Sequence, residues 1–289
     1  MYERGWRRYA VLALFLGPSL VGVAIFTAGP IVASFALSFT NWDLITPARF
    51  VGAANYERLM SDEEFWRTLR NTLSFLLGYV PLVIASGLFV AVLLNTKIPG
   101  RQIFRAMYFL PVVTSWVAVA LIWRWLYNPA YGLINSFLGL IGVRGPGWLF
   151  DPNWAMPAII LTSVWKDTGF VMVILLAGLQ GIPRQYYEAA SIDGANFFER
   201  LRFITIPLLT PALVFALSIS LINSFQVFDQ VYVMTEGGPA GATMVLVERI
   251  VRNAFSFSRM GYASAMSWSL FGLIFATTLV FYLLRRGRS

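Results

Sequence analysis

Six long apolar runs alternate with more polar segments along this chain. They cover approximately residues 10–38, 71–94, 106–126, 156–180, 205–228 and 263–284. Each run stays apolar for about twenty residues or more, which is the length that an α-helix needs to cross the hydrocarbon core of a bilayer. Transmembrane β-strands would give short alternating segments instead. The pattern therefore predicts an all-α polytopic membrane protein, with six transmembrane helices in one domain over residues 1–289.

The first run is longer than one crossing needs, and it contains two prolines, Pro18 and Pro30. Proline removes a backbone hydrogen bond inside a helix, and an overlong apolar stretch fits a bilayer by tilting or bending. We therefore expect a kink or a tilt in this span.

The basic residues are distributed unevenly between the two sides of the predicted bundle. An even number of spans places both termini on one side. The segments on that side are 1–9, 95–105, 181–204 and 285–289, and the opposite segments are 39–70, 127–155 and 229–262. Twelve Lys and Arg residues lie in the shorter first set, against eight in the longer second set. The positive-inside rule then predicts that both termini are cytoplasmic.

Composition narrows the chemistry that the chain can carry. It is 58% hydrophobic and 12% charged, and its net charge of +8 follows from the uneven loops, so we expect no nucleic-acid partner. Cys and His are both absent, which argues against metal sites, disulfides and most intramembrane enzymes. The two lysines, Lys97 and Lys166, do not follow glycine, so no Walker A phosphate loop is present. We expect no cofactor in this chain and an energy source on another polypeptide.

The loop 181–204 on the predicted cytoplasmic side is the most informative segment. Pro183 suits the first turn of a short helix, Asp193-Gly194 would end it, and a second short helix can follow from Asn196. Small residues at 189, 190, 194 and 195 leave a surface that a partner groove could approach closely, with the charges of Glu188 and Asp193 at its edge. The alternative is an amphipathic loop that lies at the headgroups.

The residues of this loop resemble a known signature. The pattern runs Glu188-Ala189-Ala190, three residues, Gly194, nine residues, then Ile204-Thr205-Ile206-Pro207. It is similar to the EAA motif of bacterial ABC importer permeases, from which it departs by Ile206 in place of Leu. Segments 50–56, 71–72, 127–135, 165–166, 236–239 and 260–265 also resemble carbohydrate permeases of the MalF/UgpA type.

The resemblance implies a fold, a location and a set of partners. The fold would be that of a type I ABC importer permease (MetI-like) in the bacterial inner membrane. The loop 181–204 would be the coupling helix that docks on a cytoplasmic ATPase, through Glu188, Ala189, Ala190, Asp193, Gly194 and Ala195. The implied partners are a second EAA-type permease, two ATPase copies that carry ATP and Mg, and an extracytoplasmic solute-binding protein.

Polar residues inside spans are candidates for the substrate path because they are costly in lipid. In the fifth span these are Ser220, Asn223, Ser224 and Gln226, with Asp229 at its end. Hydroxyl and amide groups can donate and accept hydrogen bonds, as a sugar requires. Hydrogen bonding between helices is the structural alternative.

The fourth span adds the candidates Trp165, Lys166 and Asp167. Neighbouring opposite charges on a helix cannot face each other. A structural ion pair is the competing explanation for these charges, with Arg124 as one candidate partner of Asp167.

The sequence thus predicts an importer subunit for a sugar or oligosaccharide. Glycerol-3-phosphate or a glycerophosphodiester is the alternative substrate, since Lys166 or Arg124 could meet a phosphate. A secondary transporter is a further alternative, but it would need coupling carboxylates and usually an internal repeat.

Overall fold

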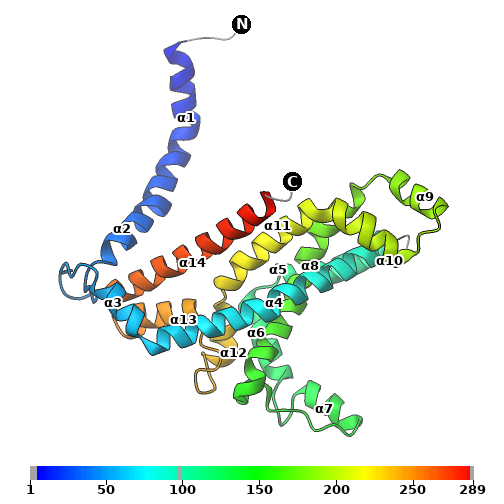
Figure 1. Cartoon of the computed structure of the whole chain (residues 1–289). Coiled ribbons are helices and arrows are strands. Elements are labelled where there is room, and N and C mark those ends of the chain that lie inside the picture. Colours follow the sequence, from blue (N-terminus) through cyan, green and yellow to red (C-terminus); the bar gives the residue numbers. More distant parts are fainter. Residues whose placement is uncertain (1–4, 97–98, 287–289) are drawn as a thin grey trace. The chain divides into compact units, whose positions relative to one another are not determined.

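The computed structural model describes residues 5–96 and 99–286, and these residues are almost entirely helical (Figure 1). Within those ranges there is no strand, only an isolated bridge between Thr40 and Phe50. The predicted all-α fold class is therefore confirmed. Lys97 lies outside the described residues.

The helices are joined by connections of varied length. In chain order the α-helices are α1 (Trp6–Val23), α2 (Gly29–Leu37), α3 (Ala54–Ser61), α4 (Glu63–Asn95), α5 (Arg101–Val113), α6 (Trp116–Leu126), α7 (Leu133–Leu140), α8 (Pro152–Gln180), α9 (Arg184–Ile192), α10 (Phe197–Arg200), α11 (Ile206–Phe225), α12 (Asp229–Thr235), α13 (Leu246–Val251) and α14 (Met260–Arg286). The π-helical turns are η1 (Ala24–Ala28), η3 (Leu201–Thr205) and η4 (Arg252–Ser256), and η2 (Trp148–Phe150) is a 3₁₀ turn.

Five helical stretches among the described residues are long and apolar enough to cross a membrane. They are Tyr9–Leu37, Glu63–Asn95, Pro152–Gln180, Phe197–Phe225 and Met260–Phe281. The first joins α1, η1 and α2, and its π-helical turn lies just before Pro30, whose missing N–H cannot complete the regular ladder.

The predicted span 106–126 is not one continuous helix. It is a pair, α5 and α6, bent by 99° at Thr114 and Ser115, which both have extended backbones. Pro111 removes one donor from the last turn of α5, and the Thr114 N–H bonds to the Pro111 carbonyl at 3.2 Å. The side chain of Thr114 then satisfies the Leu110 carbonyl at 3.0 Å. Continuous apolarity predicted the crossing but carried no signal for the break.

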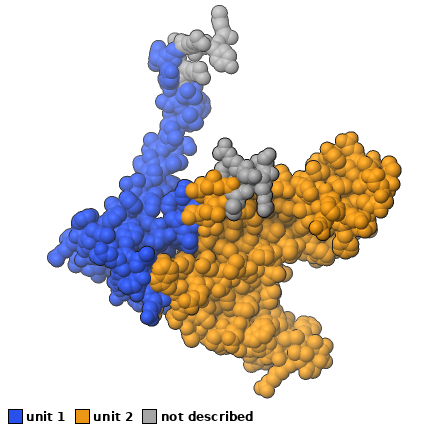
Figure 2. All heavy atoms as spheres, viewed as in Figure 1, with its two compact units in different colours: residues 1–63, 250–275 blue, residues 64–249, 276–289 orange. Residues whose placement is uncertain are grey.

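The described part of the chain forms two compact units. Figure 2 shows them in different colours, one built from residues 1–63 and 250–275 and the other from 64–249 and 276–289. In the first unit, the amide of Asn55 donates to the carbonyls of Ser38 (2.8 Å) and Thr40 (2.7 Å). The Tyr262 hydroxyl donates to Asp62 at 2.6 Å, which ties α14 to the loop before α4.

Helix α8 is the centre of the second unit. It packs against α5, α11 and α12, and most of its apolar stretch is buried. Glycines permit the close approach: a Cβ at Gly169 would overlap the Tyr108 carbonyl of α5, and one at Gly178 would lie 2.7 Å from Leu209 of α11. The polar groups of interest in the second unit are therefore held by a tightly packed helix.

Candidate functional site: a loop between spans and a polar cavity

The loop 181–204 forms a small two-helix projection, made of α9 and α10 (Figure 1). Helix α9 ends in a tight turn at Gly194, whose φ is +78°. The Ala195 N–H donates to the Ala190 carbonyl (2.9 Å) and the Gly194 N–H to that of Ser191 (3.2 Å). This is the Schellman motif, in which glycine supplies the left-handed residue.

Side chains fix the projection from within. Asn196 and Glu199 form a reciprocal capping box at the start of α10, with bonds of 3.1 and 2.7 Å. Arg200 donates to the Ser191 hydroxyl at 3.2 Å and so links the two short helices. The hydroxyls of Tyr187 and Thr205 lie 3.0 Å apart and join α9 to η3, at the base of α11. These contacts connect α9 directly to the segment from which α11 begins.

The outer face of the projection carries the residues that the sequence singled out. Glu188, Ala189, Asp193 and Gly194 are exposed, and Ala190 and Ala195 are half-buried. A Cβ at Gly194 would meet no atom of this chain within 4 Å. Two neighbours that the sequence analysis did not single out, Ile192 (87% exposed) and Phe198 (76% exposed), add apolar surface beside the small residues.

A second feature is a cavity of about 250 Å³ in the same unit, which we call the Asp167 cavity. Four predicted path residues line it together: Asp167 from α8, Asn223 from α11, Gln226 and Asp229. The other residues around it are Phe75, Tyr79, Trp116, Val227, Phe228 and Gln230. Its walls thus combine amides, carboxylates and aromatic rings.

Asp167 accepts a hydrogen bond from a hydroxyl group. The Tyr79 hydroxyl donates to Asp167 Oδ2 at 2.8 Å. The suggested partner, Arg124, instead donates to the Val233 carbonyl at 3.4 Å, so the proposed Arg124–Asp167 ion pair is wrong. A bond to a neutral hydroxyl leaves the carboxylate with oxygen lone pairs that can face the cavity.

Four predicted path residues point elsewhere. Ser220 and Ser224 are buried, and the Ser224 hydroxyl donates to the Leu221 carbonyl of its own helix at 2.7 Å. Trp165 packs edge-on against Trp123 with ring centres 5.4 Å apart. Ser220, Ser224 and Trp165 therefore do not line the Asp167 cavity.

Lys166, the fourth of these residues, supports the break between α5 and α6. Its ammonium group donates to the Val112 carbonyl at 3.2 Å and lies 4.7 Å from the centre of the Trp116 ring. It therefore donates to a carbonyl that the broken helix leaves without a helical partner. Lys166 contacts the Trp116 ring but does not itself line the Asp167 cavity.

Sequence reasoning missed Tyr79 and Trp116. Both lie inside apolar runs that are rich in aromatic residues, where nothing marks one ring as facing a cavity. A tyrosine near the middle of a span, away from the interfacial belt, is the available signal for Tyr79. For Trp116 the signal depends on knowing that the helix breaks.

Comparisons with known proteins show that this chain is similar to transport components. The family described as binding-protein-dependent transport system inner membrane component matches residues 83–289. The trehalose/maltose transport system permease protein MalF of Thermococcus litoralis is 39% identical over 276 residues, which cover 95% of this chain and 93% of that protein. The lactose transport system permease protein LacF of Rhizobium radiobacter is 38% identical over 262 residues, covering 88% and 87%.

A solved structure shares the fold. The crystal structure of a bacterial alginate ABC transporter, in complex with an alginate pentasaccharide-bound periplasmic protein, contains a chain that matches with a TM-score of 0.85. The match covers 97% of this chain and 96% of that one, at 24% sequence identity.

The cavity geometry predicts how cysteines introduced into this cysteine-free chain react. Asn223→Cys and Gln226→Cys place a thiol at the exposed wall of the cavity, so a hydrophilic maleimide should label both quickly. Ser220→Cys and Ser224→Cys are matched controls on the buried face of α11 and should stay unlabelled in the folded protein. Equal labelling rates at Asn223→Cys and Ser224→Cys would contradict the described orientation of α11.

Proposed function

This chain belongs to the family of binding-protein-dependent transport system inner membrane components, and we propose that it imports a sugar or oligosaccharide as one of two permease subunits of an ABC transporter. It is a multi-pass membrane permease component and not an enzyme. The observation that carries the sugar assignment is the chemistry of the Asp167 cavity.

The cavity suits a neutral, hydroxyl-rich solute. Amides of Asn223, Gln226 and Gln230 can donate and accept, and the two carboxylates can accept hydrogen bonds from sugar hydroxyls. The rings of Trp116 and Phe228 offer flat apolar surface for the C–H face of a pyranose. Two relatives described above are named for trehalose/maltose and for lactose transport, which supports the same class of substrate.

The wall of the cavity argues against the alternative substrates. A glycerol phosphate compound needs a cation, yet the described residues that line the cavity include Asp167 and Asp229 and no Lys or Arg. Lys166 and Arg124, the two cations considered for a phosphate, bond to backbone carbonyls elsewhere. A secondary transporter is disfavoured by the family to which the chain belongs.

The energy for transport would come from partners. Two cytoplasmic ATPase subunits would bind ATP and Mg, a second EAA-type permease would complete the pathway, and an extracytoplasmic binding protein would deliver the solute. The exposed surface at Glu188, Ala189 and Gly194 supports this arrangement. Ala189 and Gly194 are small, so the groove of a partner could approach this turn closely. The distribution of Lys and Arg supports cytoplasmic termini.

The docking proposal predicts that Gly194→Asp and Glu188→Lys each abolish substrate-stimulated ATP hydrolysis by the assembled transporter. Aspartate tolerates the left-handed backbone at 194, so the variant should fold and insert, but its side chain would occupy the space kept for the partner. The measurement is ATPase activity in proteoliposomes, with and without binding protein and sugar.

Gly142→Asp is the matched control for backbone strain. Gly142 has a φ of +76°, open space around it and the same Schellman hydrogen bonds at the end of α7, on the side opposite to the loop 181–204. It should keep nearly normal coupling. Unchanged coupling in both Gly194→Asp and Glu188→Lys would refute the docking assignment.

The substrate proposal predicts that Asn223→Ala raises the KM for sugar-stimulated ATP hydrolysis by about fivefold, since one hydrogen bond is worth roughly 1 kcal/mol. Ser224→Ala, one residue away and buried, should leave the KM unchanged. The assay uses the assembled transporter at saturating binding protein. The reverse ranking of the two variants would place the substrate on the other face of α11.

A further inference from the structure

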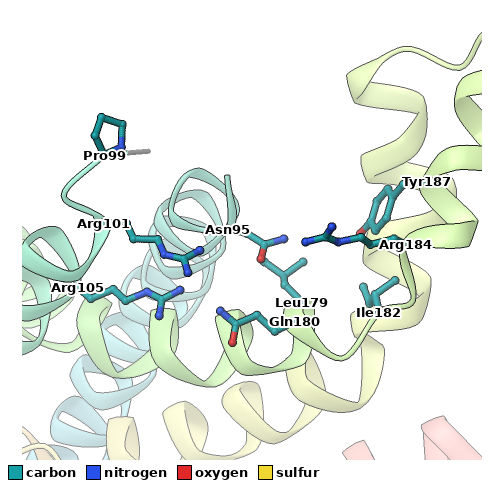
Figure 3. Close-up of a pocket in the computed structure, with 9 residues that line it drawn as sticks. All are labelled: Asn95, Pro99, Arg101, Arg105, Leu179, Gln180, Ile182, Arg184 and Tyr187. Carbon is teal, nitrogen blue, oxygen red and sulfur yellow. The ribbon is translucent and has the colours of Figure 1, made fainter. Parts of the chain in front are cut away.

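A larger pocket lies at the C-terminal end of α8, next to the loop 181–204. Its volume is about 940 Å³, and it is lined where α4 and α8 end and where α5 and α9 begin. Figure 3 shows the guanidinium groups of Arg101 and Arg105 reaching into it from one side and that of Arg184 from the other, with Asn95 and Gln180 between them. We call it the arginine pocket.

The charges in this pocket are unbalanced. Three arginines converge, and none of the described residues that line the pocket is acidic. Arg101 and Arg105 lie one turn apart on the same face of α5, so their like charges repel. An anion between the three groups would offset this repulsion.

Arg105 carries the more specific signal. Its Nε and Nη2 atoms are buried and have no hydrogen-bond partner. Leaving buried donors unpaired costs free energy, and more so when the group is charged. The positive-inside rule concerns basic residues in loops, where their charged groups can be exposed to water. It therefore does not explain why these nitrogens of Arg105 are buried.

Geometry indicates which anion fits. Two helices begin and two end at the pocket, so their dipoles oppose each other and the guanidinium groups set the potential. Arginine forks match the oxygens of a phosphate group, and the amides of Asn95 and Gln180 can add hydrogen bonds. The ends of the long apolar helices α4 and α8 place the pocket at the level of lipid headgroups.

We propose that the arginine pocket binds a phosphate group through Arg101, Arg105 and Arg184, carried either by an anionic phospholipid or by a soluble phosphate. This site is separate from the Asp167 cavity, whose described lining contains carboxylates and no cation. It would tie the base of the loop 181–204 to the anion, since Arg184 is the first residue of α9.

The test titrates the purified full-length chain, in a neutral detergent, with two probes: inorganic phosphate and short-chain phosphatidylglycerol. Saturable binding of at least one probe is expected. The double variant Arg101→Gln/Arg184→Gln should weaken that binding by about tenfold or more, because two charge-assisted contacts are lost. Both side chains are exposed, so their replacement leaves the packed core intact.

Arg202→Gln is the matched control. Like each of the two replacements in the double variant, it removes one positive charge from an exposed position. Arg202 lies in η3, outside the pocket, so this variant should bind the probe as the unmodified chain does. Binding of phosphate identifies a soluble anion site, and binding of phosphatidylglycerol alone identifies a headgroup site.

Three results would overturn the proposal: binding of neither probe, equal binding by the double variant, or an equal loss in Arg202→Gln. A further outcome is that neither probe binds while the double variant also loses its binding to the ATPase subunits. In that case the pocket receives an acidic side chain of a partner protein, and the phosphate proposal is wrong.

Discussion

A polypeptide backbone inside hydrocarbon finds no hydrogen-bond partner except in the protein itself, and this constraint shapes the helices that span the membrane. Long unbroken helices satisfy it directly. Where the chain breaks within an apolar run, at Thr114 and Ser115, side chains take over the freed carbonyls: Thr114 donates to Leu110 and Lys166 to Val112. These two bonds lower the cost of the break, after which Trp116 lies at the wall of the Asp167 cavity.

The same constraint sorts the polar side chains of α11. The Ser224 hydroxyl donates to a carbonyl of its own helix and is buried, whereas the neighbouring Asn223 lines the cavity. Asp167 remains tolerable within a span because Tyr79 donates to it. Polar groups that bond within the protein serve the fold, and those that remain at a cavity wall are available to a solute.

Much of this arrangement follows from the sequence, because insertion into a membrane depends on local composition. Apolar run lengths predicted the helical fold, and the spacing around Gly194 predicted the turn in the loop 181–204. Which residues meet across helices depends on rotation and on local breaks, which periodicity in a uniformly apolar run does not encode. For that reason the sequence named Lys166 as a candidate for the substrate path without indicating its bond to the Val112 carbonyl at the break, and it did not single out Tyr79.

In the proposed function the solute path and the source of energy are separate. The solute would pass the Asp167 cavity, and the ATPase subunits would dock on the projection formed by α9 and α10. The most direct test reconstitutes the purified chain in liposomes, alone and together with a second permease, the ATPase subunits and the binding protein, and measures uptake of labelled sugar. The account predicts ATP-dependent uptake by the complete assembly and none by the chain alone. Sugar uptake by the chain alone, without any nucleotide, would contradict it.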